Sequence, residues 1–244
     1  MPLSVAPSVP IVLVPGLSCS PRLFAAQIPH LWQSGHVTVA NTLHGSSMQA
    51  LAASILRDAP ARFALAGLSM GGYIAFEILR QAPERVRGLA LLNTSARPDT
   101  AEATANRLAL MQLAERGKFL LSAAQNYPRS VHPAHANDTA LQATVMQMAK
   151  DVGVAAFLHQ QKAIISRPDS RPDLPRITCP TLVLGGDSDT LTPPELAQEM
   201  ATSIPNAHLS IVPQCGHLST LEQPEAVTAI LLDWLQQYSG LGHG

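Results

Sequence analysis

Short, almost uninterrupted apolar runs alternate along the chain with segments whose apolar residues recur every three or four positions. The first pattern is typical of strands buried on both faces of a sheet, and the second is typical of amphipathic helices. The runs that predict strands are Ile11–Val14, His36–Ala40, Phe63–Ala66, Gly88–Asn93, Thr181–Gly185 and His208–Val212. The helical patterns between them are Met48–Arg57, Gly71–Gln81, Pro194–Ser203 and Glu222–Gln237. This alternation predicts an α/β protein with a mostly parallel sheet and helices on both of its faces.

One region, between residues 97 and 173, contains no convincing strand pattern. Its helical patterns are Ala101–Arg116, Lys118–Ala124, Thr139–Lys150 and Val154–Ser166. We therefore expect a helical cap, inserted after the fourth predicted strand. Residues 1–95 and 176–244 would form the core, and residues 96–175 would form the cap. Ligands of open α/β sheets bind at the carboxyl ends of the strands, where we expect the cap to lie.

Composition narrows the class of protein. Of 244 residues, 46% are hydrophobic and 14% are charged, and the formal net charge is -1, so the chain can form a large core. The absence of a basic stripe makes nucleic acid an unexpected partner. No apolar run approaches the roughly 20 residues that span a bilayer, and Met1–Pro10 lacks the positive charge of a signal peptide. We expect a cytoplasmic protein without membrane contact, whose oligomeric state the sequence leaves open.

The three cysteines, Cys19, Cys179 and Cys215, are few and odd in number. They match neither a disulfide framework nor the spacing of a zinc site. We expect free thiols in a reducing compartment.

A Gly-Leu-Ser-Met-Gly motif at Gly67–Gly71 follows one predicted strand and precedes a predicted helix. A serine on such a sharp turn projects its hydroxyl at the top of the sheet, and glycines two residues to either side avoid a collision with neighbouring backbone. The glycine spacing of phosphate-binding loops is absent. The motif fixes only three residues, Gly, Ser and Gly, and matches by chance in roughly one chain of this length in ten. Ser69 can therefore be identified as a nucleophile only if the sequence also supplies a base and an acid.

Two further loops follow predicted strands and should reach the same edge of the sheet. His217 follows the last strand, and an imidazole with a pKa of about 6.5 suits a general base near neutral pH. The loop after Thr181–Gly185 carries Asp187 and Asp189, either of which could orient the histidine. This loop does not match a calcium site, because Leu191 stands where a third oxygen ligand is needed.

With these motifs in the chain order Ser, Asp, His, the sequence resembles the α/β-hydrolase superfamily over nearly its whole length. Val12–Leu17 is similar to the family's oxyanion loop, and Gly67–Gly72 to its nucleophile elbow in the Ser-Met-Gly-Gly form. Asn41–Gly45 occupies the place of the D-x-x-G-x-G loop. Asp187–Pro193 and Gln214–His217 match the loops of the acid and the base.

The resemblance implies specific roles. In the family the acid stands four residues before the proline, which selects Asp189 over Asp187. The implied oxyanion donors are the backbone N–H groups of Leu17 and Met70. The chain departs from the family in having Pro15 before Gly16, where histidine is usual, and in lacking the N-terminal β-hairpin, so we expect six strands, with room for one short extra strand.

The implied activity is that of a serine hydrolase, a carboxylesterase-like enzyme that cleaves a small or medium ester through an acyl-enzyme, with no cofactor and no metal. Because the cap is apolar and no Arg/Lys cluster is visible, we expect a neutral small-molecule ester as the partner. A lactonase, a C–C bond hydrolase and a perhydrolase use the same triad and stay open. A receptor that binds a small ligand on this fold without catalysis is an alternative from a different class.

Overall fold

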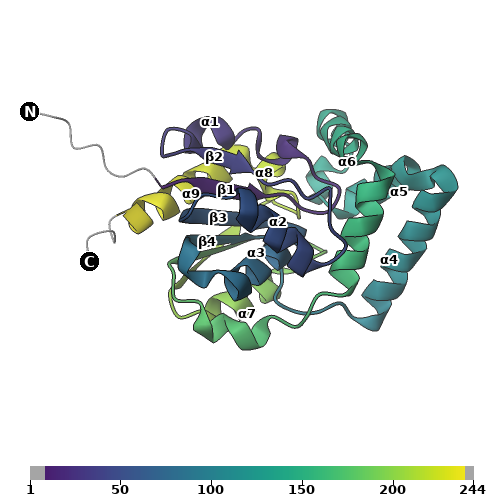
Figure 1. The fold of residues 1–244 in the computed structure, drawn as a ribbon. Coiled ribbons are helices and arrows are strands. Elements are labelled where there is room, and N and C mark those ends of the chain that lie inside the picture. Colours follow the sequence, from purple (N-terminus) through teal and green to yellow (C-terminus); the bar gives the residue numbers. More distant parts are fainter. Residues whose placement is uncertain (1–8, 240–244) are drawn as a thin grey trace, which may run out of the picture.

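The computed structural model describes residues 9–239, and Figure 1 shows their arrangement. Almost all of Met1–Pro10, for which we predicted no signal peptide, and the residues after Ser239 lie outside the described part of the chain. The six strands are β1 (Ile11–Val14), β2 (Val37–Val39), β3 (Phe63–Leu68), β4 (Val86–Leu92), β5 (Thr181–Gly186) and β6 (Ala207–Val212). They form one sheet in the order β2-β1-β3-β4-β5-β6, and every neighbouring pair is parallel. The predicted parallel sheet is confirmed.

The register of the central strands brings their carboxyl ends to one edge. Val14 pairs with Gly67, and Leu68 pairs with Leu92. Every residue of β1, β3 and β5 is buried, which explains their nearly continuous apolar sequence. Loops that follow these strands therefore start from a rigid, shared platform.

Helices cover both faces of the sheet (Figure 1). On one face, α2 (Met48–Asp58), α3 (Met70–Gln81) and α7 (Pro194–Ser203) share a buried apolar cluster with alternate strand residues. On the other face, α1 (Ile28–Leu31) and α9 (Pro224–Ser239) share a second cluster.

The last predicted helix, Glu222–Gln237, is wrong at its start. The short helix α8 (Ser219–Glu222) ends at Glu222, and α9 begins at Pro224. Proline has no N–H to contribute inside a helix, but its fixed φ suits the first helical turn, so the helix begins there.

The region after β4 is helical, as predicted. It contains α4 (Ala101–Leu113), a π-helical turn at Ala114–Lys118, α5 (Phe119–Asn126) and α6 (Thr139–Ile165). These helices lie beyond the carboxyl ends of the strands (Figure 1). The two helices predicted at 139–150 and 154–166 are present, because the backbone of Gly153, with a φ of 74° and a ψ of 169°, interrupts α6 between them. The division of the chain into a core and a separate cap stays a proposal, and "cap" below denotes residues 96–175.

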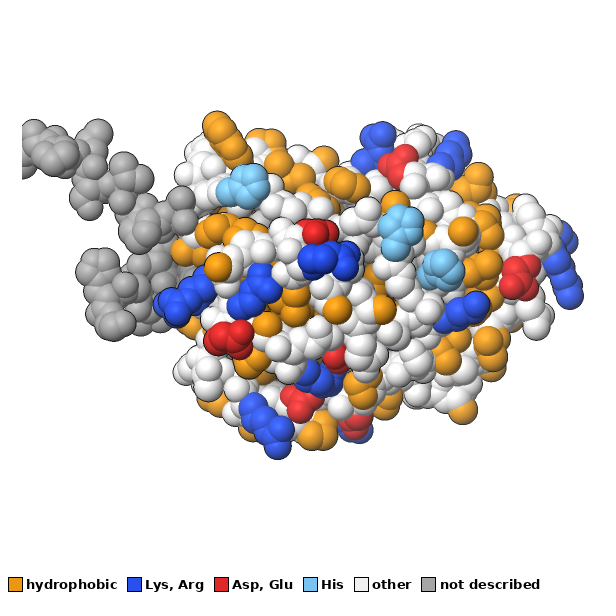
Figure 2. All heavy atoms as spheres, in the orientation of Figure 1, with side chains coloured by type: hydrophobic (Ala, Val, Ile, Leu, Met, Phe, Trp, Pro, Cys, Tyr) orange, Lys and Arg blue, Asp and Glu red, His pale blue; other side chains and the backbone are white. Residues whose placement is uncertain are grey.

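Acidic and basic side chains are interspersed on the face shown in Figure 2. Among residues 9–239, no helix combines the length and the apolar character needed to cross a membrane. The same residues contain no group of three or more His, Cys, Asp or Glu side chains placed to hold a metal ion.

Candidate active site

Ser69 stands on a sharp turn between β3 and α3. Its φ of 55° and ψ of −113° lie outside the regions that residues other than glycine usually adopt. A Cβ on Gly67 would lie 2.3 Å from the Gly71 carbonyl oxygen, and a Cβ on Gly71 would lie 2.0 Å from the Val14 carbonyl oxygen. Both positions therefore require glycine, because any side chain there would collide with neighbouring backbone, as the motif suggested.

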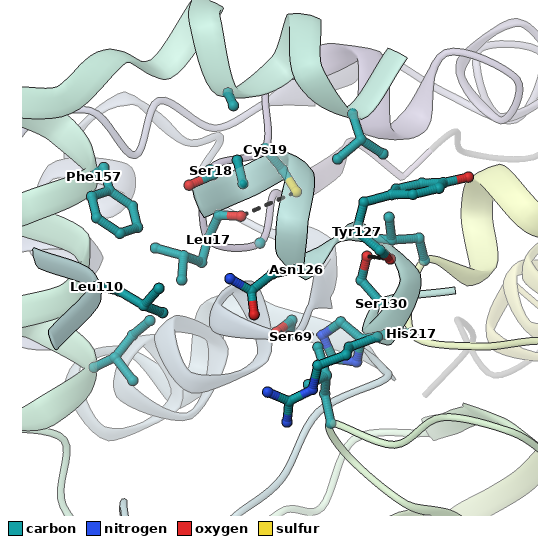
Figure 3. A pocket seen from close by; sticks show the side chains of 18 of the residues that line it. Leu17, Ser18, Cys19, Ser69, Leu110, Asn126, Tyr127, Ser130, Phe157 and His217 are labelled. Carbon is teal, nitrogen blue, oxygen red and sulfur yellow. Dashed lines mark hydrogen bonds between the residues drawn. The ribbon is translucent and has the colours of Figure 1, made fainter. Parts of the chain in front are cut away.

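The structure brings Ser69, His217 and Asp189 into one chain of contacts. Ser69 Oγ lies 2.9 Å from His217 Nε2, and His217 Nδ1 lies 2.8 Å from Asp189 Oδ2. Figure 3 shows Ser69 and His217 next to each other at the cavity described below. A hydroxyl, an imidazole and a carboxylate in this order can transfer the serine proton to the histidine while the carboxylate stabilises the resulting imidazolium.

The Asp189 carboxylate is buried and surrounded by donors. Oδ1 accepts from the Leu191 and Thr192 amides at 2.8 and 2.9 Å. Oδ2 also accepts from the Thr192 hydroxyl at 2.6 Å and from the Asn93 side-chain amide at 3.0 Å. Burial alone raises the pKa of Asp189, but the charge of His217 and these hydrogen bonds together hold it below its usual range. The carboxylate is thus ionised at neutral pH.

Asp187 has a different set of partners. Its carboxylate accepts from the backbone amides of Gln214 and Cys215 at 2.9 and 3.1 Å. Burial raises its pKa, but these two hydrogen bonds, the Ser188 hydroxyl and the charge of His132 together hold the pKa below its usual range. No hydrogen bond joins Asp187 to His217 in the described part of the chain. Asp187 therefore anchors the loop that carries the histidine rather than the histidine itself.

The loop after β1 lies against Ser69. A Cβ on Gly16 would lie 3.4 Å from the Ser69 Cβ, so the two backbones approach closely. Within residues 9–239, no acceptor takes a hydrogen bond from the Leu17 amide. The Met70 amide is the first of α3 and has no acceptor inside the helix. Both amides are free to donate to a ligand.

A residue that the sequence did not single out, Gln160, holds this loop from the cap. Its side chain is fully buried, and Oε1 accepts from the Ser18 amide at 3.0 Å. Nε2 donates to the carbonyl and the hydroxyl of Thr42, both at 3.2 Å. Gln160 thus joins α6 to the loops after β1 and β2. No sequence motif marks this role, which becomes visible only from the packing of α6 on these loops.

Glu222 is a second residue that sequence reasoning missed. Its fully buried carboxylate accepts from the amides of Gly216 and Leu218, at 3.1 and 3.0 Å, on either side of His217. It also accepts from the His132 amide at 2.6 Å and lies 3.2 Å from His135 Nδ1. Glu222 therefore fixes the backbone of the histidine loop and joins it to the cap.

Backbone strain gathers at this edge. Among the described residues, those other than glycine with positive φ are Ser18, Ser69, Asn93 and Gln214, at 58°, 55°, 44° and 51°. Each lies in a loop that follows a strand. Such conformations persist only where the surroundings enforce them, and they cluster at functional sites.

A cavity of about 430 Å³ opens beside Ser69 and His217. Figure 3 shows Leu110 and Phe157 on the side opposite His217 and Asn126 between them. Phe119 and Phe157 pack with ring centroids 4.7 Å apart and form part of its apolar wall. The cavity has the size of a small-molecule site.

The cavity also contains a thiol. Cys19 lines it, but burial raises the pKa of this thiol to about 12, so the thiol is uncharged at neutral pH and a weak nucleophile. All three cysteines are free, as predicted. Ser69 is the better-placed nucleophile.

Comparison with known proteins matches residues 11–230 to a model of the alpha/beta hydrolase family. The chain is similar to a thermophilic esterase from Thermogutta terrifontis, solved with malate bound, with 31% identity and a TM-score of 0.86 over 95% of this chain and 90% of that one. It is 27% identical, over 94% of its length and 92% of the relative's, to "Putative carbamate hydrolase RutD" of Stutzerimonas stutzeri. It is 25% identical to the pimeloyl-[acyl-carrier protein] methyl ester esterase of Aromatoleum aromaticum, over 91% of this chain and 96% of that protein.

Proposed function

Because the chain belongs to the α/β-hydrolase family and is an esterase-like hydrolase, we propose that it cleaves small or medium carboxylic esters with Ser69, His217 and Asp189 as a catalytic triad. The observation that carries this proposal is the continuous contact chain of 2.9 and 2.8 Å from Ser69 Oγ through His217 to Asp189. Relatives named as esterases support an ester as the substrate class.

In the proposed first step, His217 Nε2 takes the Ser69 proton as Oγ attacks the ester carbonyl carbon. The carbonyl oxygen becomes an oxyanion that the Leu17 and Met70 amides stabilise. When the intermediate collapses, the C–O bond to the alcohol breaks, and His217 gives its proton to the departing alcohol. Ser69 is then acylated.

The second half repeats these steps with water. His217 removes a proton from a water molecule, which attacks the acyl carbon, and the carboxylic acid leaves as Ser69 regains its proton. Asp189 stays ionised throughout, and it keeps Nδ1 of His217 protonated so that Nε2 can act as the base.

The test is hydrolysis of a p-nitrophenyl ester series from acetate to dodecanoate, with Ser69→Ala in parallel. We expect turnover with an optimum chain length and a loss of roughly 10⁴-fold or more in kcat in the variant. Full activity in Ser69→Ala would overturn the assignment. If no ester reacts and a fluorophosphonate also leaves Ser69 unlabelled, the proposal fails in favour of a binding protein on this fold.

A further inference from the structure

Gln161, on α6, has an unsatisfied amide beside the cavity. The residue is fully buried and lines the cavity, and its Oε1 accepts from Arg107 Nη1 at 3.0 Å. Its Nε2 has no hydrogen-bond partner among residues 9–239. A buried donor without an acceptor is costly, so this amide is suited to a ligand that supplies the acceptor.

Arg107 adds a second set of donors at the same place. It extends from α4 into the cavity wall, and its Nε donates to Asp99 Oδ2 at 2.7 Å. Its second terminal nitrogen, Nη2, donates to no acceptor within the described residues. The free edge of the guanidinium and the Gln161 amide together offer a cluster of N–H donors.

The local charge is positive. Asp99, whose side chain is 3% exposed, forms ion pairs with both Arg107 and Arg167. Arg167 stacks over Tyr73, another residue of the cavity wall, at 4.2 Å. One buried carboxylate faces two guanidinium groups, so the cluster keeps one uncompensated positive charge next to the cavity. The nearby Arg97 and Arg171 are paired with Glu199 and Asp169.

The cluster adjoins the wall of the cavity that faces His217. Gln161 is one helical turn beyond Phe157, and Arg107 is one turn before Leu110. Figure 3 shows Phe157 and Leu110 across the cavity from His217. The wall near the cluster contains the apolar side chains of Leu110, Phe119 and Phe157, and the polar Asn126 lies between them and His217.

We propose that Gln161 and Arg107 form a subsite for a carboxylate at the far end of the substrate. A carboxylate accepts several planar N–H donors at once and is stabilised by a net positive charge. The inference rests on the proposed ester hydrolysis and makes the substrate an ester with an apolar chain that ends in a carboxylate. It replaces the neutral ester that the sequence favoured.

The experiment compares three ester series at equal chain length, from five to nine carbons, with ethanol release as the readout. The series are monoethyl esters of dicarboxylic acids, ethyl esters of monocarboxylic acids, and diethyl esters of the same dicarboxylic acids. We expect kcat/KM for the monoethyl diacid esters to exceed both others by roughly tenfold or more at the best length, mainly through KM. If the neutral esters match them at every length, the subsite is overturned. If only the diethyl esters match them, the site reads a carbonyl rather than a charge, and the carboxylate assignment is overturned.

Variants locate the effect. Gln161→Glu keeps the acceptor for Arg107 but replaces the free donor with a negative charge, so the preference for acid esters over neutral esters should fall at least tenfold. Arg107→Gln removes the charge and leaves Asp99 paired with Arg167, and it should reduce the same preference. Gln49→Glu, on the exposed surface of α2, changes the net charge equally and should have no effect. Unchanged preference in both cavity variants would overturn the proposal.

A binding measurement separates this proposal from the proposed function. Calorimetry with Ser69→Ala should detect hexanedioate binding at least tenfold tighter than hexanoate, and Gln161→Glu in the same background should abolish the difference. This result would support the subsite even if no ester were hydrolysed. Equal affinity for the two acids would overturn it even if the wild type proved to be an esterase.

Discussion

Two glycines show how differently the edge of the sheet and the cap are built. Gly71 lies so close to β1 that a Cβ would come within 2.0 Å of the Val14 carbonyl oxygen. Gly117, in the cap, has a positive φ of 75°, but a Cβ there would have no neighbour within 4 Å. At the edge of the sheet, backbone packs directly against backbone. In the cap, Gly117 allows a left-handed backbone conformation and has open space around it. Chemistry that needs fixed positions belongs to the first region, and selection among substrates can be changed in the second.

The largest expected effect concerns the choice of acid at the edge. Asp189→Asn should lower kcat by roughly 10³- to 10⁴-fold, because asparagine can neither fix the required tautomer nor stabilise the imidazolium. Steady-state kinetics on the best ester measures the change. Asp187→Asn is the matched control and should cost less than about tenfold, since its carboxylate contacts only loop atoms. The reverse ranking would show that the acid is misassigned.

The steric difference between the regions can be tested in the fold itself. Gly71→Ala should destabilise the protein by about 3 kcal/mol or more, because the added methyl group meets a carbonyl that belongs to a central strand. Urea denaturation gives the free energy of unfolding, and the yield of soluble protein gives a cruder readout. Wild-type stability in this variant would mean that the edge relaxes more easily than its contacts suggest.

Glu222 joins the two regions, and its removal should affect both stability and activity. Glu222→Gln places an amide group among N–H donors and should cost about 2 kcal/mol of unfolding free energy. Because the Gly216 and Leu218 amides flank His217, kcat should also fall, with little change in KM. Glu225→Gln, exposed at the start of α9, is the control. A variant that loses stability but keeps its kcat would restrict Glu222 to a structural role.

The smallest effect is expected in the cap. Gly117→Ala should cost only about 1 kcal/mol, the strain of a left-handed conformation without any collision. Thermal and urea denaturation should show a small shift, with kcat on short esters unchanged. A loss as large as that of Gly71→Ala would remove the contrast between the two regions.

How much the sequence predicts follows the same division. Ser69, Asp189 and His217 could be found because each follows a strand, and a parallel sheet brings the ends of its strands together. The sheet itself was predictable because its buried strands are nearly continuous in apolar residues. The start of α9 was missed because the sequence pattern did not separate the short helix α8, which ends at Glu222, from the helix that begins at Pro224.

The cap was predictable as helical but not as a binding surface. Asp99, Arg107, Gln161 and Arg167 lie up to 68 positions apart and carry no motif. They meet only because α4 and α6 pack against each other, and periodicity gives no crossing angle or register for such a pair. Gln160 and Gln161 are adjacent in sequence, yet one supports a loop of the core and the other faces the cavity, a distinction that only the rotation of α6 determines.

The hydrogen bond that the Ser18 amide donates to Gln160 limits how caps can be exchanged between proteins of this fold. A transplanted cap that lacks a glutamine at this place would leave Ser18, whose φ is 58°, without the acceptor that holds its strained backbone. The adjacent Leu17 amide, the proposed oxyanion donor, would then be held less firmly in position. We therefore expect a chimaera chosen only for its new pocket to be a poorer catalyst. Gln160 belongs to the proposed cap but supports the loop of the proposed oxyanion donor, so cap designs should include it from the start.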